Sequence, residues 1–244
     1  MYWTIYIIII AYFVPGTVGI WFVNRNREPE VIRRSWIKHL TYFIIINVLF
    51  FSITLNVILF RYIAIAIIIA GFIELIKLFM ESGYRHKLFF MAAIFILALL
   101  ASGFLIFSRM DQGIILFAFI ILCIFDGLSQ LTGQLIGKRK LFPKISPNKT
   151  VEGFLGGAGV AILSSMVFRQ VIPELTMPET LILSGVVVLF AFAGDTAKSV
   201  YKRKYNVKDF SRIIPGHGGV LDRFDSLIAG GAGVALLSWL AGRL

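Results

Sequence analysis

Long apolar runs separated by short polar loops recur along the whole chain. Crossing a hydrocarbon layer of ~30 Å takes roughly 20 helical residues, and lipid offers backbone groups no hydrogen-bond partners. The alternating pattern of a barrel strand is absent. The pattern therefore predicts an all-α fold, a polytopic integral membrane helical bundle with about eight transmembrane helices. The predicted spans are residues 2–23, 41–60, 62–80, 88–108, 113–133, 153–172, 180–200 and 226–241.

Composition agrees with this class of protein. The 244 residues are 58% hydrophobic and only 15% charged, with a mean hydropathy of +0.87, which excludes an ordinary soluble domain. The net charge of +11 would suggest nucleic acid binding in a soluble protein, but here it predicts basic cytoplasmic loops and no nucleic acid partner. The odd-numbered loops carry 18 Lys and Arg residues, against 3 in the other loops and the carboxyl tail. By the positive-inside rule, both termini lie outside.

The chain is predicted to be one membrane domain with two regions. Residues 1–112 hold four spans with few polar positions, whereas residues 113–244 hold four spans with most of the glycines, and the chemistry is expected there. No Lys or Arg precedes the first apolar run, so we interpret it as a retained anchor rather than a signal peptide. The single cysteine, Cys123, lies in an apolar run and excludes an intrachain disulfide.

The long polar stretch at residues 194–226 combines carboxylates, cations and glycines. Asp222 and Asp225 are three residues apart and share a face if the last helix begins near residue 221. Together with Asp195 they form a candidate all-oxygen site of the kind that suits Mg²⁺. The glycine-rich turn at His217 supplies backbone that can approach a phosphate closely. The alternative is a solvated loop between two helices.

A second basic loop, residues 134–152, is predicted on the same side of the membrane. Ser146 followed by Pro147 is typical of a helix start, where free N–H groups and Lys149 would bind an anion. Asp126 stands near the end of the fifth span, and ionisable residues within spans usually face a polar cavity or a partner. Interfacial snorkelling and hydrogen bonding between helices are the alternatives for Asp126. Glu74 and Lys77 are three residues apart and are expected to neutralise each other.

These motifs resemble a known family. The pattern reads Ser199, Lys202-Arg203, Lys208-Asp209, His217-Gly218-Gly219, Asp222-Arg223 and Asp225, preceded by Asp126 and by Ser146-Pro147-Asn148-Lys149-Thr150. It resembles the signature of the phosphatidate cytidylyltransferases, also called CDP-diacylglycerol synthases, over roughly residues 120–228. The chain departs from the family pattern at Tyr201, at residues 127–130, and at Lys198, where many members have a glutamate.

The resemblance implies that CTP and phosphatidate, or a similar lipid phosphate, give CDP-diacylglycerol and pyrophosphate. It implies Mg²⁺ as cofactor, alone or with a second cation, and a homodimer surrounded by membrane lipids. The bacterial plasma membrane is expected, with the active site on its cytoplasmic side. The expected metal ligands are Asp195, Asp222 and Asp225, with Lys202 and Arg203 as further catalytic residues. The expected substrate-binding residues are Ser146, Lys149, Thr150, Ser199, Lys208, Asp209, His217, Gly218, Gly219, Arg223 and Asp126.

Two other functions remain open from the sequence. A CTP-dependent polyprenol kinase would use the same nucleotide but transfer the γ-phosphoryl group and release CDP. An anion or lipid transporter would line a path with Asp126, Asp195 and Glu74. Two basic, glycine-containing loops on one side of the membrane favour an enzyme, because a transporter has no need of them.

Overall fold

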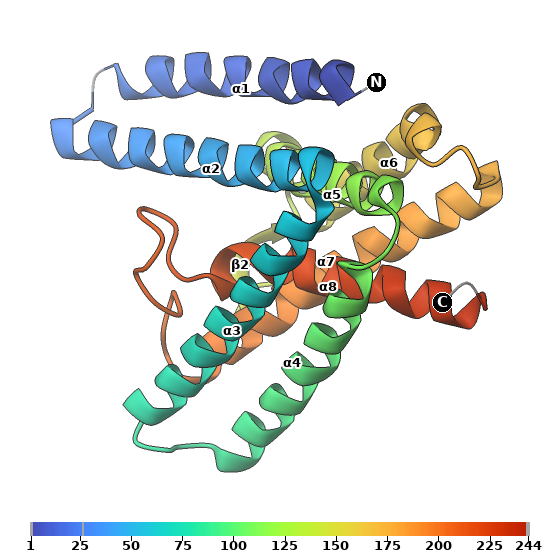
Figure 1. Ribbon diagram of the computed structural model, residues 1–244. Coiled ribbons are helices and arrows are strands. Elements are labelled where there is room, and N and C mark those ends of the chain that lie inside the picture. The colour runs from blue at the N-terminus through green and yellow to red at the C-terminus, as the bar shows by residue number, and fades with distance from the viewer. Residues whose placement is uncertain (1, 26, 243–244) are drawn as a thin grey trace.

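The computed structural model describes residues 2–25 and 27–242, and almost all of them are helical or in short connections (Figure 1). The elements are α1 Tyr2–Asn24, α2 Pro29–Leu55, α3 Val57–Glu81, α4 Lys87–Phe107, α5 Gln112–Ile136, β1 Lys140–Phe142, β2 Ser146–Thr150, α6 Val151–Phe168, the 3-10 turn η1 Arg169–Val171, α7 Met177–Lys204 and α8 Leu221–Leu240. Each predicted span corresponds to one of the eight α-helices. The all-α, polytopic fold class is thus confirmed.

The count of eight spans is not confirmed. Among the described residues, six helices, α2 to α7, are long and apolar enough to cross a membrane. The helix α8 has 20 residues, but its first turns carry Asp222, Arg223 and Asp225.

Several helices extend beyond the apolar runs that predicted them, and α2 and α7 show why. The helix α2 begins at Pro29, twelve residues before the predicted span, because proline suits the first turn and the polar residues that follow are good helix formers. The helix α7 continues through Lys202, Arg203 and Lys204, whose positive charges favour a helix carboxyl end. Hydropathy marks where a helix is apolar, and it does not mark where the helix ends.

The predicted helix start at Ser146 is wrong. Residues Ser146–Thr150 form strand β2, which pairs with β1 in an antiparallel hairpin. A residue before proline is pushed towards extended backbone, so the pair Ser146-Pro147 favours a strand here. The helix α6 starts five residues later, where the Thr150 hydroxyl accepts a hydrogen bond of 3.1 Å from the Gly153 N–H.

Helix α8 forms the centre of the bundle. It packs closely against α7 and α4, and residues 225–235 are all buried. Small residues make this possible: a Cβ on Gly233 would lie 2.5 Å from the Phe190 ring, and one on Gly194 would lie 2.5 Å from Ala229 Cβ. Figure 1 shows α1 and α2 side by side along one edge, and α3 and α4 as a hairpin on another. The carboxyl half of α7 and the start of α8 are thereby brought together.

Candidate active site

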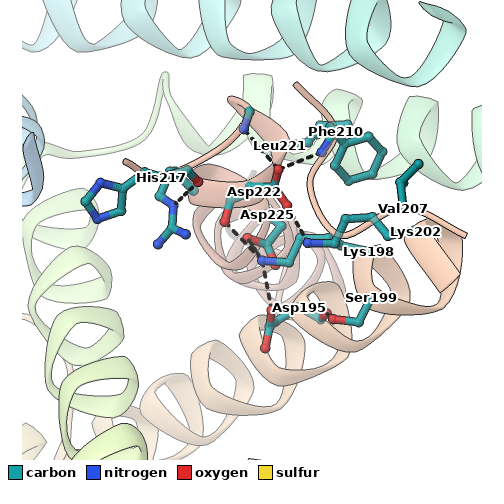
Figure 2. Close-up of polar contacts among 12 residues, drawn as sticks. Asp195, Lys198, Ser199, Lys202, Val207, Phe210, His217, Leu221, Asp222 and Asp225 are labelled. Atoms are coloured by element: carbon teal, nitrogen blue, oxygen red, sulfur yellow. Dashed lines mark hydrogen bonds and ion pairs between the residues drawn. The ribbon is translucent and has the colours of Figure 1, made fainter. Parts of the chain in front are cut away.

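The candidate active site lies where the end of α7 meets the beginning of α8. Asp195, Lys198 and Lys202 are three and four residues apart, so they follow one face of α7. The first turns of α8 present Asp222 and Asp225 to that face. Figure 2 shows the side chains of Lys198 and Lys202 directed from α7 towards the two aspartates of α8. We call these five residues, together with Lys149, the carboxylate–lysine cluster.

The cluster is held by a chain of ion pairs. Lys198 Nζ lies 2.9 Å from Asp195 Oδ1 and 2.9 Å from Asp225 Oδ1. Lys202 Nζ lies 2.5 Å from Asp222 Oδ1. The charges alternate along Lys149, Asp195, Lys198 and Asp225, and Lys202 and Asp222 form a separate pair. Three carboxylates are thus matched by three ammonium groups, and the cluster is close to neutral. Buried charges are tolerated only when they are paired in this way.

Lys149 reaches the cluster from the β-hairpin. Its Nζ lies 2.6 Å from Asp195 Oδ2, donates to Thr196 Oγ1 at 2.9 Å, and stands 4.5 Å from the centroid of the Phe192 ring. Although residues Ser146–Thr150 form a strand and not a helix start, Lys149 still reaches the site. The hairpin joins α7 through this lysine and through Arg203, whose Nε donates to the Ile145 carbonyl at 3.1 Å.

Asp222 fixes the loop that leads into α8. Its Oδ2 accepts backbone N–H groups from Phe210 at 2.8 Å and from Gly219 at 2.9 Å. The residue is 4% exposed. Substitution of Asp222 is therefore expected to loosen residues 210–219 as well as to free Lys202 from its carboxylate.

The His217-Gly218-Gly219 turn lies against α2. The His217 ring stacks on Tyr42 with centroids 6.4 Å apart, and its carbonyl accepts a 3.0 Å hydrogen bond from Arg223 Nε. Gly218 has φ +87°, a conformation that only glycine adopts readily. Burial, and then the charges of Arg223 and Lys38, lower the pKa of His217 below its ordinary value of 6.5, so the ring is neutral at pH 7.

Glu74 is a site residue whose role was not predicted from the sequence. It is 2% exposed, and its carboxylate accepts the N–H groups of Val220 at 2.9 Å and of Leu221 at 2.8 Å, and the Ser211 hydroxyl at 2.6 Å. The expected pairing with Lys77 is wrong, because Lys77 pairs with Glu81 at 3.8 Å. Glu74 thus holds the amino end of α8 from α3.

Several predicted site residues lie outside the cluster. Lys208 and Asp209 are exposed on the loop, and neither forms a hydrogen bond or ion pair with another described residue. Ser199 donates to the Asp195 carbonyl within α7, at 2.8 Å. Arg203 points to backbone carbonyls, and Ser146 lies in β2. The structure brings together the three aspartates and the lysines of the cluster. The catalytic role of Arg203 and the substrate-binding roles of Lys208, Asp209, Ser199 and Ser146 stay predictions.

Asp126 lies on α5. It is exposed, and it has no hydrogen bond or ion pair among the residues that the structure describes. The second oxygen of Asp225, Oδ2, is buried and has no hydrogen-bond partner in the described part of the chain.

The donor chemistry of the cluster suits Mg²⁺, but the arrangement does not. Of the six oxygens of Asp195, Asp222 and Asp225, only Asp225 Oδ2 lacks an ammonium or backbone N–H donor. No three His, Cys, Asp or Glu side chains among the described residues are placed to hold a metal ion. As arranged, the three aspartates therefore do not fit a resident Mg²⁺. Their predicted role as metal ligands stays a prediction.

The fold and the cluster define a polytopic helical membrane protein with paired carboxylates and ammonium groups at the end of one helix and the start of the next. The model of the cytidylyltransferase family matches residues 30–241, which is most of the chain. The chain belongs to this family.

Individual relatives agree with this assignment. A phosphatidate cytidylyltransferase of Staphylococcus epidermidis is 43% identical over 152 residues, which cover 59% of this chain and 58% of the relative. A Bacillus subtilis protein of the same name is 44% identical over 116 residues, covering 47% of this chain and 43% of the relative. One from Staphylococcus aureus is 39% identical over 152 residues, covering 59% and 58%. The chain thus spans about two fifths to three fifths of the length of these relatives.

Proposed function

We propose that the protein transfers the cytidylyl group of CTP to phosphatidate or a similar lipid phosphate and releases pyrophosphate. One observation carries the proposal: two ammonium groups with N–H donors to spare, those of Lys149 and Lys202, converge from separate elements on one carboxylate cluster. Membership of the cytidylyltransferase family and the names of the relatives support the same reaction.

In the proposed reaction an oxygen of the lipid phosphate bonds to the α-phosphorus of CTP. The bond from the α-phosphorus to the oxygen that bridges it to the β-phosphorus breaks, and pyrophosphate leaves with that electron pair. The lipid phosphate is already an anion, so no protein base is needed. Catalysis then consists of placing two anions together and neutralising the charge that develops on the leaving group.

The lysines differ in how many donors they have left for this task. An ammonium group has three N–H donors. Lys149 uses two of them, on Asp195 and Thr196, and Lys202 uses one, on Asp222. We propose that their free donors bind CTP phosphate oxygens, because an ammonium group is a good point charge for phosphate. Arg223 and the neutral His217 lie at the neighbouring turn, where we place the rest of the nucleotide.

We propose that Mg²⁺ enters as the magnesium complex of CTP and is thus part of the substrate. The occupied oxygens of the three aspartates favour this over a resident ion. We also propose that the protein is a homodimer in the bacterial plasma membrane with its active site on the cytoplasmic side. The distribution of Lys and Arg supports the cytoplasmic side, and the bacterial relatives support the bacterial plasma membrane.

The test is to incubate detergent-purified protein with Mg²⁺, phosphatidate and CTP labelled in the cytosine ring. Label that enters the lipid extract together with an equal amount of pyrophosphate supports the proposal. Label recovered as CDP, with a phosphorylated alcohol from added polyprenol, would establish the kinase instead. A protein that binds no CTP is not a cytidylyltransferase, and the transporter would then be tested in vesicles.

The Lys202→Gln variant sharpens this test, with Lys204→Gln as its matched control. Both substitutions remove one positive charge from the last turn of α7. Lys202 contacts the cluster, whereas Lys204 is exposed and its Nζ stands 6.0 Å from the centroid of the Phe89 ring. If both variants keep wild-type turnover, the cluster is not where CTP reacts.

A further inference from the structure

Lys198 differs from the other two lysines of the cluster because all of its donors are used within the protein. Its Nζ lies 2.9 Å from Asp195 Oδ1, 2.9 Å from Asp225 Oδ1 and 3.1 Å from the Asp222 carbonyl oxygen. An ammonium group has three N–H donors, so none remains for a ligand. The three lysine side chains are similarly buried, at 11–17% exposed, and the difference is therefore one of partners.

The acceptors around Lys198 are those of a cation site. Two carboxylate oxygens and one carbonyl oxygen surround a single positive centre, and hard cations prefer such oxygen ligands. These acceptors come from both α7 and α8, so the centre joins the two helices that form the site. The second oxygen of Asp225, Oδ2, is buried and has no hydrogen-bond partner among the described residues.

We propose that Lys198 is the resident cation of this cluster: its ammonium group occupies the place between Asp195 and Asp225 that a divalent ion would otherwise take. The free protein then binds no divalent ion there. Removing the ammonium group leaves the buried Asp225 carboxylate without a cation beside it and leaves Asp195 paired only with Lys149. Two neighbouring carboxylates with one positive charge between them strongly attract a divalent cation. Binding of a divalent ion to the free protein does not depend on the proposed function.

The test measures Mn²⁺ binding to purified protein in detergent without nucleotide, from the electron paramagnetic resonance signal of the free ion. Lys198→Gln keeps the length of the side chain without its charge, and Lys204→Gln is the matched control at an exposed position of the same helix. The expected result is one additional Mn²⁺ bound per chain in Lys198→Gln, at least about tenfold tighter than any binding by the wild type. Lys204→Gln is expected to follow the wild type.

Two results would overturn the inference. One is an identical Mn²⁺ isotherm for Lys198→Gln and the wild type, when both elute as the same single species in gel filtration. The other result needs no Lys198 variant. If the wild type binds one Mn²⁺ and the Asp195→Asn variant binds none, a metal ion already occupies the place assigned to the Lys198 ammonium group. The second experiment decides the matter if Lys198→Gln does not fold.

The outcomes are independent of the CTP assay. Wild-type protein that makes no CDP-lipid, while Lys198→Gln gains the Mn²⁺ site, refutes the proposed reaction and leaves the resident cation standing. Wild-type protein that makes CDP-lipid and also holds Mn²⁺ at Asp195 without nucleotide supports the proposed reaction and refutes the inference that Lys198 is the resident cation.

Discussion

Replacing Glu74 by glutamine changes one buried acceptor in the middle of the molecule. The carboxylate takes the Val220 N–H and the Ser211 hydroxyl on Oε1, and the Leu221 N–H on Oε2. A glutamine has one acceptor oxygen and one NH₂ group. Whichever way the amide is turned, at least one N–H at the start of α8 loses its acceptor and faces another donor.

The expected cost follows from these contacts. Losing a hydrogen bond to a charged group costs about 1.5–3 kcal/mol, and losing a negative charge at a helix amino end costs a further ~0.3–1 kcal/mol. Glu74→Gln should therefore destabilise the protein by about 2–4 kcal/mol. For a chain of this size that corresponds to a fall in Tm of roughly 5–15 °C.

The assay is thermal unfolding of the detergent-purified variant, followed by tryptophan fluorescence, together with trypsin cleavage of the loop at Lys208 and Arg212. Cleavage should become faster in Glu74→Gln, because the loop loses its anchor at Ser211. Glu81→Gln is the control, since it breaks only the exposed pair with Lys77, which is worth at most ~1 kcal/mol. If the two variants have the same Tm and the same cleavage rate, Glu74 does not anchor α8.

Three further predictions concern the same region. Lys202→Gln should lower kcat/KM for CTP by about 10- to 100-fold through the loss of one charged hydrogen bond, with Lys204→Gln near wild type in steady-state kinetics. Gly219→Ala should lower the free energy of unfolding by about 1–3 kcal/mol, because the new Cβ would lie 2.5 Å from the Glu74 carboxylate. Gly185→Ala is the control, since its Cβ would meet no heavy atom within 4 Å. An equal Tm for the two variants would contradict the packing at Gly219. His217 has a lowered pKa in the folded protein, so the unfolded chain takes up the proton first and the free energy of unfolding falls as pH drops below 6.5. The loss of Tm between about pH 7.5 and 5.5 should be smaller in His217→Asn, and an equal loss would show that this ring does not titrate as described.

Hydropathy predicted the order of the helices because each apolar run marks one of them, although only six helices of the described part of the chain are long and apolar enough to span a membrane. The ends of α2 and α7 were missed because polar residues such as Glu30 and Arg203 continue a helix without any apolar signal. The strand at Ser146 was missed because Ser-Pro occurs both at helix starts and in extended segments. Pairing with β1 decides between these two, and that pairing is not local.

The carboxylate–lysine cluster was predicted only in part. Asp195, Asp222 and Lys149 lie in motifs, and the structure brings them to one place. Which lysine pairs with which aspartate depends on the rotation of α7 against α8, which no local pattern encodes. The signal for Glu74 was present, since a buried glutamate in a span needs a partner and a helix start needs acceptors for its N–H groups. Its partners lie 146 and 147 residues away, and a nearby lysine offered a simpler pairing.

The anchor at Glu74 also bears on how the chain can be divided. Helix α3, in the apolar first half, supplies the Glu74 acceptor for the start of α8. The Tyr201 hydroxyl near the end of α7 also donates to α3, at 3.1 Å from the Leu75 carbonyl oxygen. A fragment beginning at residue 113 would keep every motif residue and lose both attachments. When the gene is split there, the fragment from residue 113 should therefore fold only if it is co-expressed with residues 1–112, which carry α3.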